Sequence, residues 1–462
     1  MASAQSIIGM PSGRTSLPLR AGAAGVVSAG RGDLGGREVI LAVCDPTVHR
    51  GALSPADGAT LADAAERAHD TELPLVIEIA SSGADVMEGL AASVGWGYAA
   101  RSIARCSGVV PVLMSVTGPA VSGPALLLGL ADHVVMTADA YAFVSGPRMV
   151  RDITGVALDN GELGGAGVHA SSTGLASIVV AAGDRAAGLA AIADLLVYMP
   201  DHVDQLPPSI ETDDSVERMC TELRELLPAS STGSYDVRDV VESLADDGEM
   251  LELRSGWAPN LVTALVTIGG QPIGVVANQP QAIAGTLDIQ ASQKGARFVS
   301  WCDAFNIGLL TLIDTPGFYP GKDLEWRGMI RHGAQLAFAY ARATVPRVAV
   351  VLRKAYGGAY IVMDSRAMGN DLYLAWPSAE IAVMGAKGAV EILHRRATPE
   401  VRAAAEADYE ARLLAPWPAA ERGSVDAVID PGDTRREVAA AFELLRTKRE
   451  RPVRRKHDNM PC

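Results

Sequence analysis

Cysteine is scarce in this sequence, and its spacing excludes the usual cysteine-based sites. Only five of the 462 residues are cysteines. They lie far apart, with no Cys-x-x-Cys pair and no secretory signal before them, so neither a zinc ribbon nor a disulfide framework is supported. We therefore expect no metal site. The cysteines are Cys44, Cys106, Cys220, Cys302 and Cys462.

Long hydrophobic runs are missing as well. The apolar stretches, for example residues 109–116, have the length of a strand and are interrupted by Pro or Gly well short of a membrane span. We therefore expect a soluble cytoplasmic protein in a reducing compartment, with no membrane partner.

Positive charge is in the minority, because 40 Lys and Arg residues stand against 54 Asp and Glu residues, for a formal net charge of -14. Nucleic-acid binding relies on clustered Lys and Arg, so no nucleic-acid partner is expected. One basic run near the C-terminus is typical of a solvated or subunit-contacting tail, with a nucleic-acid or membrane patch as the alternative. Its residues are Arg446, Lys448, Arg449, Arg451, Arg454, Arg455 and Lys456.

Side-chain catalysts of the common kinds are also scarce. The sequence has no Gly-x-Ser-x-Gly elbow, no His-Glu-x-x-His zinc motif and no phosphate-binding Gly-x-x-x-x-Gly-Lys. Packing or surface roles account for His133, His169, His332 and His394 at least as well as catalysis does. The absence of an evident acid/base pair favours chemistry that relies on backbone donors.

The composition that remains is typical of an α/β protein with two domains. The sequence is 48% hydrophobic and contains 47 Gly and 26 Pro, and its length predicts two substantial domains. A polar stretch at about 209–256 separates two Gly-rich apolar regions. We predict an N-terminal segment over residues 1–38, a first domain over 39–225 and a second over 226–462.

The two regions share a series of landmarks in the same order, which indicates an internal duplication. In each, an apolar strand ends in a glycine turn, a second strand opens with Val-Pro, and another glycine follows at the same distance. Strands that alternate with helical stretches predict two copies of a ββα-type fold with parallel pairing. The landmarks are the runs from Leu73 to Gly83 and from Ile307 to Gly317, the Val-Pro pairs at 110–111 and 345–346, and Gly123 and Gly358.

Gly123 and Gly358 each lie in a turn that follows a strand and precedes a helical pattern. An enolate formed from a thioester collects charge on its oxygen, so an enzyme must aim hydrogen-bond donors at that oxygen. A glycine turn lets the backbone approach closely, and the helix that follows adds partial positive charge. Such a turn is usually only a connection. One turn in each half favours function, because carboxyl transfer between two carbonyl compounds needs two oxyanion sites.

The second region resembles the carboxyltransferase β subunits of acetyl- and propionyl-CoA carboxylases nearly throughout. This resemblance implies an α/β fold of two tandem crotonase-like (ClpP/crotonase) ββα-spiral domains. It also implies a hexamer whose active sites lie between the N-terminal domain of one chain and the C-terminal domain of another. The matching segments are Gly285-Thr-Leu-Asp-Ile, Lys294-Gly-Ala-Arg-Phe, Cys302-Asp-Ala-Phe-Asn-Ile, Pro316-Gly-Phe-Tyr-Pro-Gly321, Ile330-Arg-His-Gly-Ala, Ala343-Thr-Val-Pro, Arg353-Lys-Ala-Tyr-Gly-Gly-Ala-Tyr, Ala375-Trp-Pro, Val383-Met-Gly-Ala-Lys-Gly-Ala-Val and the ending Lys456-His-Asp-Asn-Met-Pro.

The resemblance assigns roles to the two turns. It implies that the backbone N–H groups of Ser122 and Gly123 hold the oxygen of the acyl-CoA thioester. Those of Gly358 and Ala359 would hold the oxygen of biotin, which a partner subunit carries as carboxybiotin. In the mechanism proposed for the family, biotin itself takes the α-proton, which explains the missing protein base.

Three further residues are expected to line the substrate site: Ile361, its neighbour Tyr360, and Gly118 at the start of the first turn. Ile361 stands where the family varies between an acidic and an aliphatic residue and where the acyl chain is read. An aliphatic residue there is similar to members that accept acetyl-CoA or are relaxed. Plain packing at the start of a helix is the alternative for Ile361.

The first turn departs from the family pattern. Asp85 stands where the family typically has Arg, and Ser122 and Pro124 replace residues of an Ala-Gly-Gly-Ala turn. Ser122 keeps its N–H, so the oxyanion hole can survive if its dihedral angles suit a residue with a Cβ. Pro124 has no N–H to donate.

These observations predict an acyl-CoA carboxyltransferase, of fatty acid or polyketide biosynthesis, that makes malonyl-CoA or methylmalonyl-CoA. The chain has no Ala-Met-Lys-Met carrier motif, so a separate biotin carboxylase and biotin carrier are the expected partners. Two alternatives stay open: a decarboxylase subunit of the same fold, and a non-catalytic assembly subunit with an altered acyl-CoA site.

Overall fold

Contacts within the chain divide it into two units, Met1–Pro207 and Pro208–Cys462. The structure is a computed structural model that describes residues 25–228, 230, 233–448, 450, 454 and 456–461. Four residues named above, Arg449, Arg451, Arg455 and Cys462, lie outside the described residues, as do residues 1–24 of the expected N-terminal segment.

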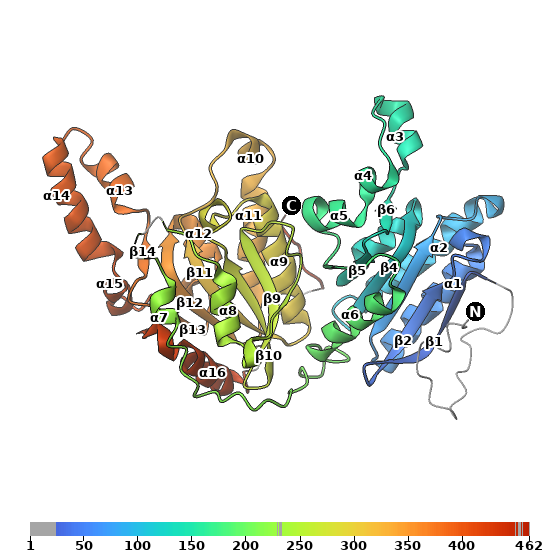
Figure 1. Ribbon diagram of the computed structural model, residues 1–462, viewed down its shortest axis with the longest axis horizontal. Helices are drawn as coiled ribbons and strands as arrows, with labels where there is room; N and C mark the ends of the chain where they lie inside the picture. Colours follow the sequence, from blue (N-terminus) through green and yellow to red (C-terminus); the bar gives the residue numbers. More distant parts are fainter. Residues whose placement is uncertain are drawn as a thin grey trace. The chain divides into compact units, whose positions relative to one another are not determined.

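The first unit is built on a seven-stranded sheet of order β1-β2-β3-β4-β5-β7, with the short strand β6 paired to the end of β4. Strands β1 and β2 are antiparallel, and the other neighbours are parallel (Figure 1). The strands are β1 (Val27–Leu34), β2 (Arg37–Cys44), β3 (Leu75–Ser81), β4 (Val112–Val121), β5 (His133–Thr137), β6 (Tyr141–Phe143) and β7 (Ile178–Val180).

Helices cover both faces of this sheet. Alternate residues of β3, such as Ile77, pack into a core with α1 (Pro55–Thr71) and α2 (Leu90–Cys106). The residue between, Glu78, pairs with Arg185 at the start of α6 (Arg185–Val197), so α6 lies on the opposite face. Burial raises the pKa of the Glu78 carboxyl, against the effect of Arg185.

The start of α1 and its packing on α2 both follow from local sequence. Ser54 and Asp57 form a capping box, and Pro55 occupies the first helical position. Gly58 and Gly95 let the two helices approach closely, since a Cβ added to Gly58 would lie 2.2 Å from the carbonyl carbon of Gly95.

The second unit is built on an eight-stranded sheet of order β15-β13-β12-β11-β10-β9-β8, with the short strand β14 paired to the end of β12. Helices α9 (Ile289–Ala304) and α11 (Met329–Arg342) pack against each other. Helices α8 (Val237–Leu244) and α16 (Thr434–Leu445) share a core with the strands (Figure 1). The strands are β8 (Leu251–Glu252), β9 (Leu261–Ile268), β10 (Gln271–Asn278), β11 (Gly308–Thr315), β12 (Arg347–Tyr356), β13 (Leu372–Ala375), β14 (Glu380–Ala382) and β15 (Ala427–Val428).

The two sheets have the same irregularity in their strand pairing, as expected for the internal duplication that the sequence indicated. The β3–β4 register shifts between Ile79 and Ser81, and the β11–β12 register shifts in the same way between Ile313 and Thr315. The end strands pair alike, with Val121 opposite Phe143 on β6 and Tyr356 opposite Ala382 on β14. Val121 and Tyr356 are therefore equivalent, and so are the residues that follow them.

The division of the chain at Pro207 differs from the boundary expected at 225/226. Residues of the polar stretch already bond within the second unit: the Ile210 N–H donates to the Gly270 carbonyl at 2.8 Å, and the Cys220 N–H to the Gly432 carbonyl at 2.9 Å. Residues 209–219 of the stretch are exposed or half-buried on that unit, whereas α8 within the same stretch packs in its core. At the other end, β1 begins at Val27, within the segment expected to precede the first domain.

Candidate active site

The first turn connects β4 to the 3-10 helix η4 (Gly123–Leu130) through Ser122. Ser122 has φ 66° and ψ -153°, a region that is essentially limited to glycine. Its N–H donates to the Phe143 carbonyl at 2.9 Å. Sheet pairing with β6 thus already uses the N–H that the resemblance assigns to the thioester oxygen. The N–H of Gly123 opens the helix and has no acceptor inside it.

The second turn connects β12 to α12 (Gly357–Val362). Gly357 has φ 59° and is the equivalent of Ser122. Gly358 and Ala359 are the second and third residues of α12, so their N–H groups have no acceptor within the helix. Both predicted donors are thus in the first turn of the helix, where N–H groups are free to bind a ligand. In the first unit, the equivalent of Ala359 is Pro124, which has no N–H group.

An aromatic ring lies behind each turn, and sequence reasoning missed both rings. A Cβ added to Gly123 would lie 2.8 Å from Cζ2 of Trp96 in α2. A Cβ added to Gly358 would lie 3.5 Å from Cε2 of Phe318. Phe318 belongs to a quoted family segment, which was a usable signal, but nothing around Trp96 in the sequence indicates its position.

The segment that contains Asp85 lies beside the first turn, since a Cβ added to Gly83 would lie 3.1 Å from Cβ of Ser122. Asp85 caps a short 3-10 turn, η3 (Val86–Glu88), by accepting the Met87 N–H at 3.0 Å. This hydrogen bond fixes the Asp85 carboxylate at the edge of the site.

A second segment missed by sequence reasoning pairs with this one. The Ser82 N–H donates to the Arg50 carbonyl at 3.1 Å, and the Leu53 N–H to the Gly83 carbonyl at 2.8 Å. This pairing places His49 and Arg50, both exposed and both with positive φ, next to the segment that borders the first turn. Basic residues therefore stand close to the acidic Asp85.

The remaining predicted substrate residues differ in exposure. Ile361 is 38% exposed on α12 and available to a ligand. Tyr360 packs edge-on against Tyr373 with ring centroids 6.1 Å apart, and burial raises the pKa of its hydroxyl. A Cβ added to Gly118 would lie 3.4 Å from Cβ of Ala80, so Gly118 makes close strand contact within the sheet.

A polar network braces the second turn from within its unit. The buried Arg353 donates from Nε to Asp314 at 3.0 Å, and the Lys354 N–H donates to the same carboxylate at 3.1 Å. The guanidinium of Arg353 also lies 5.3 Å from the ring of Tyr235. These bonds fix the last residues of β12 and β11 relative to one another.

Three of the four histidines considered above have side-chain partners. His133 is buried with Nδ1 3.0 Å from the Ser177 hydroxyl. Nε2 of His169 lies 2.8 Å from the Ala142 carbonyl. Nδ1 of His332 lies 3.2 Å from the side-chain amide of Gln293. Within the described part of the chain, no group of three or more His, Cys, Asp or Glu side chains could hold a metal ion.

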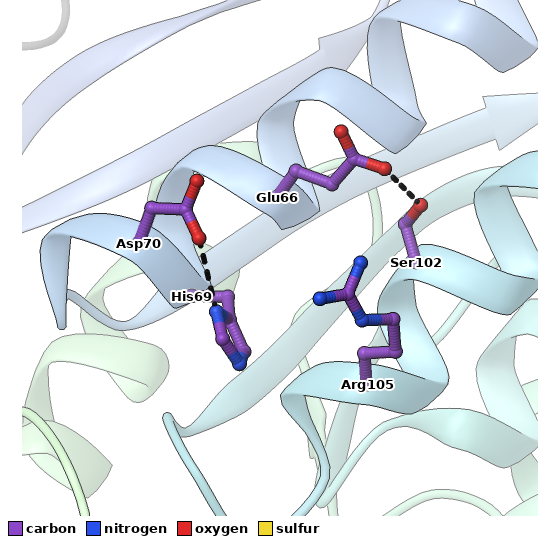
Figure 2. Close-up of a pocket in the computed structure, with 5 residues that line it drawn as sticks. All are labelled: Glu66, His69, Asp70, Ser102 and Arg105. Atoms are coloured by element: carbon purple, nitrogen blue, oxygen red, sulfur yellow. Dashed lines mark hydrogen bonds and ion pairs between the residues drawn. The ribbon is translucent and has the colours of Figure 1, made fainter.

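One surface hollow of the first unit lies between α1 and α2 and contains none of the predicted site residues. Figure 2 shows the Ser102 hydroxyl facing Glu66, which accepts its hydrogen bond at 3.1 Å, and His69 close to Asp70. Its mixed charge, from Glu66, Asp70 and Arg105, does not favour an anionic coenzyme. Over the described residues, no helix has the length and apolar character needed to cross a membrane.

Comparisons with known proteins show the family of this chain. The carboxyl transferase domain family matches residues 14–460. The methylmalonyl-CoA carboxyltransferase 12S subunit of Propionibacterium freudenreichii subsp. shermanii is 42% identical, over 95% of this chain and 84% of that protein. The propionyl-CoA carboxylase beta chain of Saccharopolyspora erythraea is also 42% identical, over 95% of this chain and 83% of its own length.

A solved structure extends the match to the fold. The transcarboxylase 12S structure, described as a hexamer assembly with hydrolysed methylmalonyl-coenzyme A bound, has a TM-score of 0.93 and 40% identity, over 95% of this chain and 86% of that one. The predicted fold of two crotonase-like domains is thereby confirmed. The predicted family is confirmed as well. The chain belongs to the carboxyl transferase family.

Proposed function

We propose that this chain is the carboxyltransferase subunit of a biotin-dependent acyl-CoA carboxylase. It would transfer a carboxyl group from carboxybiotin to the α-carbon of propionyl-CoA, acetyl-CoA or both, to give methylmalonyl-CoA or malonyl-CoA. The observation that carries the proposal is the pair of equivalent turns, each of which opens a helix with N–H groups that have no internal acceptor.

The second turn suits the oxygen of biotin's ureido group. Gly357 has a positive φ, and no side chain at Gly358 blocks a ligand from the N–H groups of Gly358 and Ala359. Biotin on a partner's carrier supplies the carboxyl group, while this chain supplies the hydrogen-bond donors that hold the oxygen in place. Fixed donors cost no reorganisation as charge develops.

The first turn suits the acyl-CoA thioester, with the Gly123 N–H as the donor. Since the Ser122 N–H is used by Phe143 and Pro124 has none, fewer donors are offered here than at the second turn. We place the coenzyme phosphates near Arg50, whose exposed positive charge would offset the negative charge of Asp85, with the exposed His49 beside it. Ile361 would contact the acyl chain, and Tyr360 and Gly118 would shape the site around it.

The assembly that we propose is a hexamer working with a biotin carboxylase and a biotin carrier subunit in the cytoplasm. The solved relative at 40% identity is described as a hexamer assembly, which supports this proposal. Each active site would combine the acyl-CoA turn of one chain with the biotin turn of another.

The proposal is tested by carboxylation of propionyl-CoA and acetyl-CoA. The purified chain is combined with a biotin carboxylase and its carrier, and labelled bicarbonate is followed into methylmalonyl-CoA and malonyl-CoA. We expect product that is lost in Gly358→Phe, because a bulky side chain would block the second turn. A folded oligomer that forms no product with any short acyl-CoA would contradict the proposal.

A second candidate is transfer in the opposite direction, from a methylmalonyl-type thioester to biotin. It is favoured by the similarity to a protein named methylmalonyl-CoA carboxyltransferase. A decarboxylase subunit of the same fold would run this half-reaction too. Labelled methylmalonyl-CoA, incubated with the chain and biotinylated carrier without ATP, would label the carrier if this direction operates.

A non-catalytic assembly subunit is the remaining alternative. The observation that favours it is the first turn, where Ser122 adopts a glycine-like conformation and donates its N–H to Phe143. Such a subunit would assemble with the partner subunits but label no acyl-CoA in either direction.

A further inference from the structure

The two equivalent turns differ in what holds them in place. In the second unit, four positions around the turn carry charged or hydroxyl side chains, whereas their equivalents in the first unit cannot form the same bonds. These positions are equivalent in the duplicated fold but carry different side chains. We therefore infer that the second turn needs these bonds and the first turn does not. The pairs, second unit first, are Asp314 and Ala80, Arg353 and Gly118, Tyr356 and Val121, and Glu380 and Tyr141.

One bond of this set lies directly at the turn. Tyr356 is the last residue of β12 and the N-cap of α12, and Glu380 is the first residue of β14. The Tyr356 hydroxyl donates a hydrogen bond to the Glu380 carboxylate. Burial raises the pKa of this hydroxyl, and the hydrogen bond to Glu380 and the charges of Glu380, Asp314 and Glu410 raise it further, so the hydroxyl stays protonated.

The bond ties the turn to the segment that follows β14. A Cβ added to Gly385 would lie 3.4 Å from the ring of Tyr356, and one added to Gly357 would lie 3.0 Å from the Val383 carbonyl. Residues 382–385 are thus in contact with both residues that precede Gly358. Strand β14 has only three residues and pairs with β12, so the side-chain bond reinforces a short backbone ladder.

We propose that Tyr356 and Glu380 are a positioning pair for carboxyl transfer. Their bond holds the Gly357–Gly358 backbone against residues 382–385, which keeps the N–H groups of Gly358 and Ala359 aimed at the biotin oxygen. This inference rests on the proposed function. It predicts a larger effect on the biotin half of the reaction than on acyl-CoA binding, for which the proposed donor is in the first unit.

The test is a double-mutant cycle in the reconstituted carboxylase. Tyr356→Phe removes the donor, and Glu380→Leu removes the acceptor. We expect each to lower kcat about tenfold or more, with a much smaller change in the KM for propionyl-CoA, because a misplaced donor acts on the transition state. The double variant should be no worse than either single variant, because the two side chains act through one bond.

Two matched variants separate positioning from general damage. Glu380→Gln keeps an acceptor and should stay within about threefold of the wild type, since a neutral hydrogen bond remains where a charge-assisted one stood. Tyr373→Phe removes a hydroxyl from another tyrosine of the same unit, one that has no hydrogen-bond partner among the described residues, and should leave kcat unchanged. Losses that add in the double variant, or a raised KM for propionyl-CoA with kcat unchanged, would overturn the proposal.

A failure of the proposed function can be told apart from a failure of the pair. If the wild-type chain transfers no carboxyl group, the proposed function is contradicted, and amide hydrogen exchange over residues 356–362 then tests the pair. Faster exchange in Tyr356→Phe than in Tyr373→Phe would support the conclusion that the Tyr356–Glu380 bond stabilises the turn. Equal exchange in both variants would contradict it.

Discussion

Ser122 and Gly357 occupy the same position at the ends of equivalent strands, and both have a positive φ, 66° and 59° respectively. Glycine adopts this conformation readily, whereas a serine there is strained. The chain therefore retains the backbone path of the turn in both halves, but with a Cβ in the first.

Replacing this serine should stabilise the first unit. We expect Ser122→Gly to raise the free energy of unfolding by about 1 kcal/mol, because the relief of strain exceeds the added flexibility of the unfolded chain. Denaturant unfolding measures the change. Ser107→Gly is the control, since Ser107 is exposed with φ -56° and gains nothing from glycine. A lower midpoint for Ser122→Gly than for the wild type would contradict the prediction.

The rings behind the two turns predict unequal responses to alanine. Gly123→Ala places a Cβ 2.8 Å from Trp96, so we expect overpacking that costs about 1–3 kcal/mol and a lower rate of carboxylation. Gly358→Ala meets Phe318 at an ordinary 3.5 Å and should fold as the wild type does. Thermal unfolding and the carboxylation assay check both variants.

The cause of the first effect can be isolated. Because Trp96 is the obstacle, the double variant Gly123→Ala with Trp96→Leu should unfold at a higher temperature than the sum of the two single losses predicts. Strictly additive losses would show that the clash with Trp96 is not the reason.

Ile361 should influence the choice of acyl group if it contacts the acyl chain. We expect Ile361→Ala to raise kcat/KM for propionyl-CoA relative to acetyl-CoA, by about 10- to 200-fold at most, since a pocket discriminates one methylene by about 1–3 kcal/mol. Competition between the two substrates in one assay measures the ratio. If the ratio of kcat/KM values is unchanged and the variant is less stable, Ile361 has only a packing role and does not contact the acyl chain.

Lys294 should make stability depend on pH. The residue is buried, its Nζ donates to the Arg254 and Trp257 carbonyls at 2.9 Å, and burial lowers its pKa to about 7. Between that value and about 10.5, the value for an exposed lysine, the unfolded chain binds the extra proton, so stability rises with pH. The slope from this one group is at most about 1.4 kcal/mol per pH unit.

The comparison with Lys294→Met isolates that slope. The variant cannot titrate at this position, so the difference in unfolding free energy between wild type and variant should grow in favour of the wild type from pH 7 to pH 9. Urea unfolding at three pH values measures it. A difference that stays constant with pH would contradict the lowered pKa of Lys294.

The sequence alone determined the duplicated architecture and the location of both turns. Strand length, the Val-Pro openings and the glycines at 123 and 358 are local features, and they repeat because each half folds by the same local rules. The family segments of the second region added the expected donors at Gly358 and Ala359, which the structure places at the open end of α12.

Only the tertiary structure decided which of these groups are free to act. The partner of the Ser122 N–H is Phe143, and the partner of the Tyr356 hydroxyl is Glu380, and both follow from the register of a short end strand. Trp96 reaches Gly123 because α2 packs over the turn. Such pairings depend on how distant segments meet in three dimensions, so they cannot be predicted from the spacing of residues along the chain.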